Sequence, residues 1–240
     1  MLKYFFAFCI ISICFSSCFI FGYRKIKGNG IYTTEKRNLS ANKIKVEGNL
    51  DIQIAQSNEP GVNIKADANL LEYIITELED ESLVIKTKRK YKLVSENPII
   101  VEVNTALLKS ISIAGKSNVK GLTKFEGGEK LDIKIAGKGN VQLAVNTPKV
   151  EVKLAGVGEI NLEGETKEVI VKISGSGNFK GKNLKAENAT IKIAGSGDAS
   201  VFASENLDVK ISGSGNVEYI GSPNIDQKIS GSGTIKPIKE

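Results

Sequence analysis

The sequence contains no histidine and no tryptophan, and its three cysteines all lie within the first 18 residues. Histidine is the usual general base near neutral pH and the commonest metal ligand, so its absence argues against hydrolytic and metal-dependent enzymes. The chain beyond Cys18 has no thiol and is expected to fold without disulfides. We therefore expect no catalytic residues, no bound metal and no cofactor.

Large aromatic side chains are also scarce, at 6% of the chain, whereas 41% of the residues are hydrophobic. The core must therefore come mainly from Ile, Val and Leu, which favour β-strands. A length of 240 residues suits one globular domain or two. The net charge of +6 permits attraction to nucleic acid, lipid headgroups or acidic glycans and does not choose among them.

An apolar run follows Lys3 and ends near Phe21, which is typical of an export signal. Within it, Ser16 and Ser17 precede Cys18 and resemble the lipobox of bacterial lipoproteins, although Phe15 stands where an aliphatic residue is usual. We interpret residues 1–18 as a lipoprotein signal peptide and Cys18 as the lipid-attachment site. The alternative is an uncleaved membrane anchor, because about 20 apolar residues can span a bilayer.

The next segment, residues 19–38, mixes Gly, Lys, Asn and Thr without a period and is predicted to be a tether to one domain over residues 39–240. Phe19 follows the candidate lipid site, where an aspartate would resemble an inner-membrane retention signal. We therefore expect an outer-membrane lipoprotein on the periplasmic face or the cell surface.

A short Gly-containing corner recurs through residues 109–240. Its first glycines are Gly115, Gly137, Gly156, Gly175, Gly195, Gly213 and Gly231, at spacings of 22, 19, 19, 20, 18 and 18 residues. A period near 20 over seven copies is typical of a solenoid. Two residues before every marker stands Ile or Leu, and four before stands Ile or Val except at Gln227. This alternation predicts an all-β fold, a parallel β-helix-like solenoid with about 18–22 residues per coil.

Each corner must turn sharply while the next coil's corner packs on it, and glycine permits this because it has no Cβ. The glycines also suggest a phosphate-binding loop, but such loops need a helix behind them, and here a strand follows. A calcium repeat is suggested by Asp198, yet the equivalent positions are mostly asparagine. Asparagine there favours either a hydrogen-bonded ladder along the stack or a left-handed corner conformation. We interpret the glycines as structural.

Residues 39–108 carry a less regular version of the pattern. They are predicted to form initial coils that cap the solenoid, because an uncovered stack end exposes unpaired strand edges. A hairpin is expected around residues 79–82 and a helical turn near residues 69–73.

A column of lysines stands three residues before six of the markers: Lys134, Lys153, Lys172, Lys192, Lys210 and Lys228. Stacked at coil spacing they would run about 24 Å along the outer surface, which suits an extended anionic ligand. The alternative is a charged face that keeps the protein soluble, since Asp132, Glu151, Asp208 and Asp226 lie two residues earlier. Nucleic acid is not expected as a partner, because no aromatic residues alternate with the lysines.

The repeated corners, for example Gly175-Ser176-Gly177-Asn178 and Gly213-Ser214-Gly215-Asn216, resemble those of the head GIN domain family of exported lipoproteins from Bacteroidetes-type bacteria. The resemblance covers roughly residues 39–235. It implies a β-helix-like solenoid and an adhesin role.

We therefore expect a non-enzymatic envelope lipoprotein, an adhesin or structural module that binds glycan or an envelope protein and is held at the membrane by its N-terminal lipid. One alternative is a glycan-processing β-helix enzyme, for which long loops interrupting the repeat would be expected. Another is an envelope scaffold that associates with itself.

Overall fold

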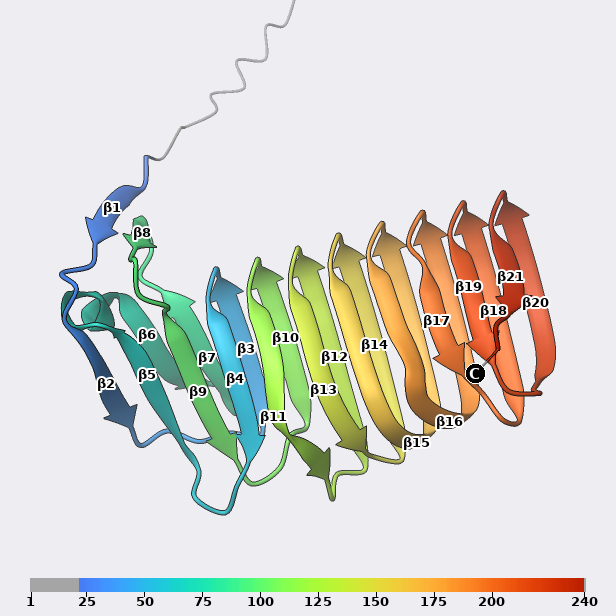
Figure 1. The fold of residues 1–240 in the computed structure, drawn as a ribbon, viewed down its shortest axis with the longest axis horizontal. Coiled ribbons are helices and arrows are strands. Elements are labelled where there is room, and N and C mark those ends of the chain that lie inside the picture. Colours follow the sequence, from blue (N-terminus) through green and yellow to red (C-terminus); the bar gives the residue numbers. More distant parts are fainter. Residues whose placement is uncertain (1–21, 240) are drawn as a thin grey trace, which may run out of the picture.

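A computed structural model describes residues 22–239 and shows an almost entirely β-structured solenoid of about six turns. The coils form a single column (Figure 1), and the predicted fold class is confirmed. The predicted signal peptide and Cys18 lie outside the described residues.

Two rows of strands run along the column. The first row ends at the corners and contains, in spatial order, β7 (Ser82–Thr87), β3 (Lys43–Gly48), β10 (Ser110–Gly115), β12 (Lys130–Gly137), β14 (Lys149–Gly156), the second parts of β15 (Glu159–Gly175) and β16 (Asn178–Gly195), β18 (Asn206–Gly213) and β20 (Asn224–Gly231). The second row contains β9 (Ile100–Thr105), β4 (Asp51–Gln56), β11 (Asn118–Glu126), β13 (Asn140–Asn146), the first parts of β15 and β16, β17 (Ala199–Phe202), β19 (Asn216–Ile220) and β21 (Thr234–Pro237). Neighbours within each row are parallel.

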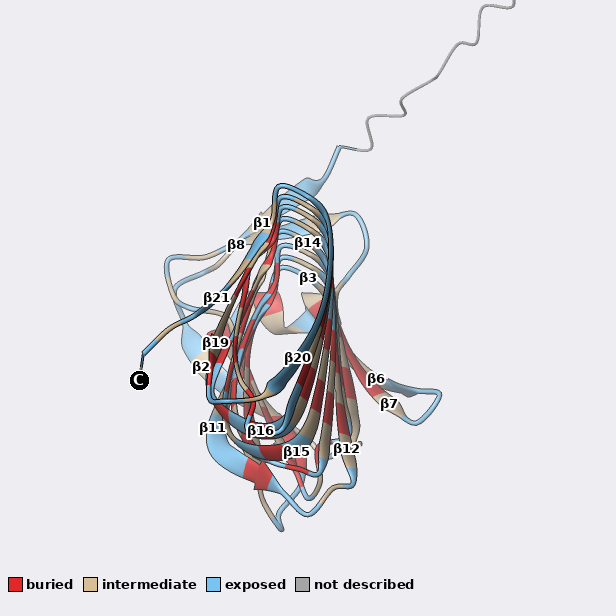
Figure 2. Ribbon diagram, turned by 90° about the vertical axis from the view of Figure 1, so that its right-hand side faces the viewer, coloured by how far each residue is buried: buried red, intermediate tan, exposed pale blue. Residues whose placement is uncertain are grey.

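The core lies between the two rows, as Figure 2 shows from the end of the column. The first row contributes an unbroken buried column of Ile111, Ile133, Val152, Val171, Ile191 and Val209. The second row contributes the column that runs from Val101 through Ile52 and Val119 to Phe179. The alternation read from the sequence is thus the inward and outward alternation of stacked strands.

The corner glycines stack in register along one edge of the column. At Gly195 the backbone has φ +129°, and a Cβ would lie 2.3 Å from the carbonyl oxygen of Gly175 in the preceding coil. No larger residue fits there without moving backbone. The column begins one coil earlier than predicted, because Gly48 of β3 pairs with Gly115.

The unequal spacings have a local cause. In β11 the register with β13 shifts between Lys120 and Lys124, and this bulge adds two residues to the first interval; one more residue lies in the turn between β11 and β12. A smaller shift where β15 pairs with β16 accompanies the 20-residue interval. Bulges absorb the extra residues, so the rows stay aligned on both sides of them.

The N-terminal end of the column is closed by antiparallel strands. Strand β6 (Ile74–Glu79) pairs with β7 in the predicted hairpin, and β5 (Gly61–Asp67) pairs with β9. The 3-10 helix η1 (Ala68–Tyr73) confirms the predicted helical turn. The coil of β3 and β4 comes first in the chain, but it is second in the stack. It lies between the coil of β7 and β9 and the coil of β10 and β11. Spatial order and chain order therefore differ in this region.

Residues 19–38, predicted to be a tether, contain two strands in the part that the structure describes. Strand β1 (Arg24–Lys27) is parallel to β8 (Tyr91–Val94), and β2 (Tyr32–Arg37) is antiparallel to β5. The guanidinium of Arg37 donates to the carbonyl oxygens of Ile74 and Leu71 and fixes β2 against the cap. A polar strand of this kind gives no hydrophobic signal, because its position comes from partners far along the chain.

Polar side chains form a hydrogen-bonded ladder beyond the corners, in place of a calcium site. The amide of Asn140 donates to Asn118 at 3.0 Å, and that of Asn118 donates to Asp51 at 2.9 Å. The same position near the C-terminal end is linked from Thr234 to Asn216 at 2.7 Å. The predicted asparagine ladder is present.

A lysine-lined groove as candidate functional site

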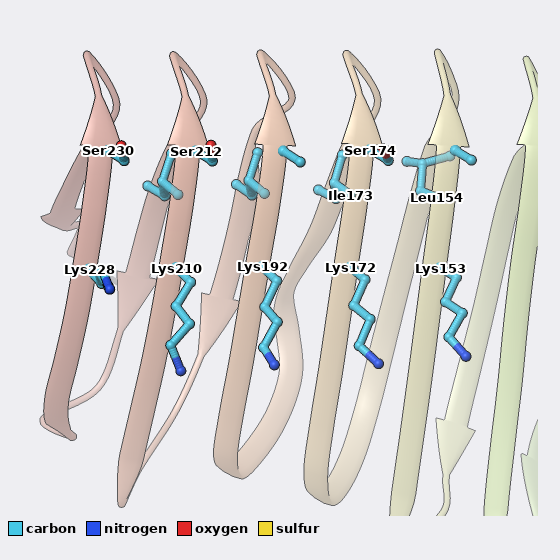
Figure 3. A pocket seen from close by; sticks show the side chains of 14 residues that line it. Lys153, Leu154, Lys172, Ile173, Ser174, Lys192, Lys210, Ser212, Lys228 and Ser230 are labelled. Carbon is cyan, nitrogen blue, oxygen red and sulfur yellow. The ribbon is translucent and has the colours of Figure 1, made fainter.

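The six predicted lysines are neighbours on the outer face of the first row. The pairing register aligns them across β12, β14, β15, β16, β18 and β20. Figure 3 shows five of these side chains side by side on adjacent strands. The same column continues through Ser112 to Lys45 of β3. Lys45 was not among the predicted lysines. We call the seven lysines the lysine ladder: Lys45, Lys134, Lys153, Lys172, Lys192, Lys210 and Lys228.

A shallow groove runs beside the lysine ladder. Its other wall is a row of small side chains two residues further along each strand, among them Ala155, Ser174 and Ala194 (Figure 3). Toward the N-terminal end the groove continues over Lys45, Ala114 and Ala136. Small residues at this row keep the groove open along its length, and the aliphatic stems of the lysines make its side largely apolar.

Glu151 neutralises part of the lysine ladder. Its carboxylate lies 2.9 Å from the amine of Lys130, 3.0 Å from that of Lys153 and 3.4 Å from that of Lys172. The side chain is only 13% exposed. Hydrogen bonds from Lys130 and Lys153, with a smaller contribution from Lys172, lower the pKa of Glu151 to about 2. Glu151 therefore stays ionised under all ordinary conditions and cannot act as a general acid.

Other lysines of the ladder have fewer acidic neighbours. Lys210 lies 3.2 Å from Asp208, and Lys45 lies 2.7 Å from Glu47, whose hydrogen bond and charge raise the pKa of Lys45. Within residues 22–239, Lys134, Lys192 and Lys228 form no ion pair.

Strands β15 and β16 lack the acidic neighbour that β14 carries beside its lysine. At the position where β14 carries Glu151, these strands carry Ile170 and Thr190. Lys172 and Lys192 therefore lack an acid two residues earlier on their own strand. The amine of Lys172 still lies 3.4 Å from Glu151 of β14, whereas Lys192 forms no ion pair among residues 22–239.

This arrangement concentrates positive charge along one face of the first row. A row of half-exposed ammonium groups supplies long-range attraction and several weak contacts to an extended ligand. Across the described range 22–239, no group of three or more Cys, Asp or Glu side chains is placed to hold a metal ion. None of the helices among those residues is long and apolar enough to cross a membrane.

The corner glycines, singled out in the sequence, do not line a ligand site. Each corner leads from one strand directly into the next, for example from β14 to β15. The backbone amides there donate to the corner of the neighbouring coil, as Ser196 does to the carbonyl of Gly175 at 2.9 Å. Donors already used in stacking are not available to a phosphate.

A comparison with protein families supports the resemblance drawn from the corners. The family described as "Putative auto-transporter adhesin, head GIN domain" matches residues 41–223. No curated protein matches the chain.

Several solved structures are similar over nearly the whole chain. A structure described as a putative adhesin from Bacteroides fragilis is 27% identical, covers 89% of this chain and all of its own, and has a TM-score of 0.78. A second putative adhesin, from Parabacteroides distasonis, is 28% identical over 90% of this chain and all of its own, with a TM-score of 0.70. A protein from the same species, described as a "Putative lipid binding protein", is 29% identical with the same coverage and a TM-score of 0.72.

Proposed function

This chain belongs to the head GIN domain family, and from that premise we propose that it is a non-enzymatic binding module of the bacterial cell envelope. Its ligand is an extended acidic polysaccharide, held along the lysine ladder. The adhesin descriptions of the similar structures from Bacteroides and Parabacteroides support a binding role.

The observation that carries the proposal is a lysine at the same outward position of six successive coils, from β12 to β20, and again in β3. Adjacent ammonium groups are about 4.8 Å apart along the column, a spacing similar to the length of one sugar unit in an extended chain. Each exposed contact is worth up to about 1 kcal/mol, so affinity depends on many contacts made together. A long, regular, shallow groove suits a polymer better than a small molecule, which needs an enclosing pocket.

The proposal is tested by binding of the full chain, kept in mild detergent, to polygalacturonate and to neutral dextran. We expect binding to polygalacturonate only, weakening as salt rises, because exposed charges are screened. The triple variant Lys134→Gln, Lys172→Gln and Lys192→Gln should bind about tenfold to a hundredfold more weakly. Equal binding to both polymers, or an unchanged affinity in the triple variant, would refute the proposal.

A matched control separates the lysine ladder from net charge. Lys167, Lys182 and Lys185 are exposed and lie outside the groove, and replacing all three with glutamine removes the same charge. We expect that variant to keep most of its affinity. The same incubations, assayed for newly released reducing ends, test the alternative of a glycan-processing enzyme. Turnover would support that alternative and contradict a binding module.

Anionic lipid is a second candidate, favoured by the apolar side of the groove and by the relative described as a lipid-binding protein. Vesicles of phosphatidylglycerol and of phosphatidylcholine distinguish the two. Binding of the full chain to phosphatidylglycerol that depends on the lysine ladder, without binding to polygalacturonate, would replace the glycan proposal by this one.

We also propose that Cys18 carries the lipid that attaches the module to the outer membrane. Labelled palmitate should enter the wild-type chain in cells and should not enter the Cys18→Ala variant. Equal labelling of the two, or none in either, would contradict this attachment and favour an uncleaved anchor. Fractionation of inner and outer membranes tests the location separately.

A further inference from the structure

The C-terminal end of the column presents an open strand edge. Strand β20 pairs with β18 on one side, and among residues 22–239 no strand pairs with its other side (Figure 1). An exposed edge of this kind is a template for another strand. The opposite end of the column differs, because β6 and β5 already cover the edges there.

The direction of the free backbone groups in β20 follows from one hydrogen bond. The N–H of Asn224 donates to Glu205 at 2.7 Å, toward β18. Since successive residues of a strand point their backbone groups to alternate sides, Ile225, Gln227 and Ile229 present their N–H and C=O groups to the open side. Three residues with free groups can form three hydrogen-bonded pairs with an antiparallel strand.

The side chains on the core side of β20 are also uncovered. Ile225 and Ile229 continue the columns of Leu207 and Ile211, which are 1% and 3% exposed, but they are 42% and 39% exposed themselves. Between them, Gln227 stands in the column above the buried Val209. The hydrophobic core is therefore exposed to solvent at the C-terminal end of the column. The amide of Gln227 lies between the two exposed isoleucines.

We propose that the open edge of β20 pairs antiparallel with β20 of a second copy of this chain, about a two-fold axis through Gln227. Reversing the strand on itself places Ile225 opposite the partner's Ile229, and Asp226 opposite the partner's Lys228. The strand is thus complementary to itself: the apolar positions pair on the core side and opposite charges pair on the outer side. The residues with free backbone groups fall at the hydrogen-bonded pairs, and the two Gln227 amides meet at the axis.

Charge supports a second copy as the partner. Within one chain, Asp226 lies beside Asp208 and Lys228 lies beside Lys210, so like charges neighbour each other at the end of the column. Such pairs are unfavourable on adjacent strands. A second copy brings a lysine next to the two aspartates and an aspartate next to the two lysines, and it relieves both contacts.

The proposed assembly is a closed dimer. The C-terminal ends join through β20. At the other end the outermost strands, β6 and β2, are antiparallel to their neighbours and do not continue the parallel stack. The two N-terminal ends then point in opposite directions along one joined column. Lys228 belongs both to the lysine ladder and to the proposed pairing. The two proposals can still fail separately, because Lys134, Lys172 and Lys192, which test glycan binding, do not take part in the pairing.

Charge reversal tests the register. Sedimentation equilibrium of the full chain in mild detergent should give a dimer. Asp226→Lys alone sets two lysines against each other in both symmetric pairs, and Lys228→Asp alone does the same with aspartates. Each change should weaken the dimer about tenfold or more. Mixing the two single variants, or combining both changes in one chain, restores opposite charges and should restore the dimer.

Two controls separate loss of the pairing from a general effect of charge and from misfolding. Asp132→Lys makes the same charge reversal at the equivalent position of β12, far from the open end, and should leave the dimer unchanged. Unfolding temperatures of all variants show whether any loss of dimer comes from misfolding. A monomer at every concentration would overturn the proposal, as would a dimer that persists equally in both single variants or a mixture that fails to associate.

Cross-linking tests the position of the two-fold axis. With Cys9, Cys14 and Cys18 replaced by serine, Gln227→Cys places two thiols on residues whose Cα atoms are about 5.5 Å apart, within disulfide range. Mild oxidation should give a covalent dimer. Asn224→Cys is the matched control, because the two residues would lie about 20 Å apart and should not cross-link. The reverse pattern would contradict the register.

Discussion

The two ends of the solenoid differ in the treatment of their last strands. At the N-terminal end, β6 pairs with β7, β5 pairs with β9 and β2 pairs with β5, all antiparallel. At the C-terminal end, β20 and β21 stay parallel to their neighbours, and nothing within residues 22–239 covers their outer edges.

The difference between the two ends shows that nothing in a parallel stack of coils itself limits the number of coils. Each coil offers the next one the same edge, so the column continues until a strand of different direction or composition covers it. The N-terminal end uses residues from distant parts of the chain for this purpose. The C-terminal end keeps the edge and the apolar columns exposed, which makes it suitable for association.

The largest effect should come from replacing a corner glycine with alanine, and two single variants at different corners allow a comparison. In Gly195→Ala, the new Cβ meets the carbonyl oxygen of Gly175 at 2.3 Å, so we expect a loss of about 4 kcal/mol in unfolding free energy. In Gly48→Ala the nearest atom is the Thr87 hydroxyl at 3.8 Å, and only the φ of +107° is unfavourable. That variant should lose about 1 to 2 kcal/mol.

Urea denaturation of both variants measures the comparison directly. Equal losses at the two corners would mean that backbone conformation alone, and not stacking of corner on corner, makes glycine necessary.

A medium effect is expected at the N-terminal cap. Arg37 is 19% exposed in its side chain and donates to Ile74 at 2.6 Å and to Thr76 at 3.0 Å. Arg37→Met leaves these acceptors unpaired and should cost about 2 kcal/mol. Hydrogen exchange should quicken in β2 and β6 while β16 keeps its protection.

Lys36→Met is the matched control, because Lys36 is exposed on the same strand, and it should leave exchange in the cap unchanged. If β16 loses protection together with the cap in the Arg37 variant, the two regions unfold as one unit and the comparison between them fails.

The smallest effect concerns the middle of the first row, at Glu151. Its pKa is lowered to about 2 by its lysine partners, so its contribution to stability is complete above about pH 4.5 and is lost as the pH falls toward 2. Glu151→Gln should therefore cost about 1 to 2 kcal/mol at pH 7. The difference from wild type should disappear near pH 2.

Glu163→Gln is the control, since Glu163 is exposed and forms no ion pair among residues 22–239. Thermal unfolding from pH 7 to pH 2 would measure both variants. A difference for Glu151→Gln that stays constant over this range would show that packing, and not ionisation, explains it.

The repeated coils could be predicted because the same short sequence pattern occurs in each of them. The N-terminal cap could not be predicted in this way. Ile44, Val46 and Gly48 follow the corner pattern, and this signal could have found Lys45 as well. The next corner glycine is Gly115, however, so no period of 20 is visible. The intervening residues form the cap, whose strands pair with partners chosen by position in space.

The lysine ladder, too, could be predicted from the sequence only in part. The sequence aligned the six lysines and the neighbouring acids, because one strand position repeats in every coil. It did not reveal that Glu151 reaches lysines on three different strands, or that Lys192 has no partner among the described residues. Side-chain reach across strands depends on the actual spacing and rotamers.

The sequence by itself determined the parallel stack, its core columns and its corner edge, because alternation and glycine spacing are local and repeat with the coil. Tertiary structure decided the order of the first coils, the pairing of β1 and β2 and the charge left on the lysine ladder. Those features depend on contacts between residues far apart in the chain, and short-range sequence patterns do not encode such contacts.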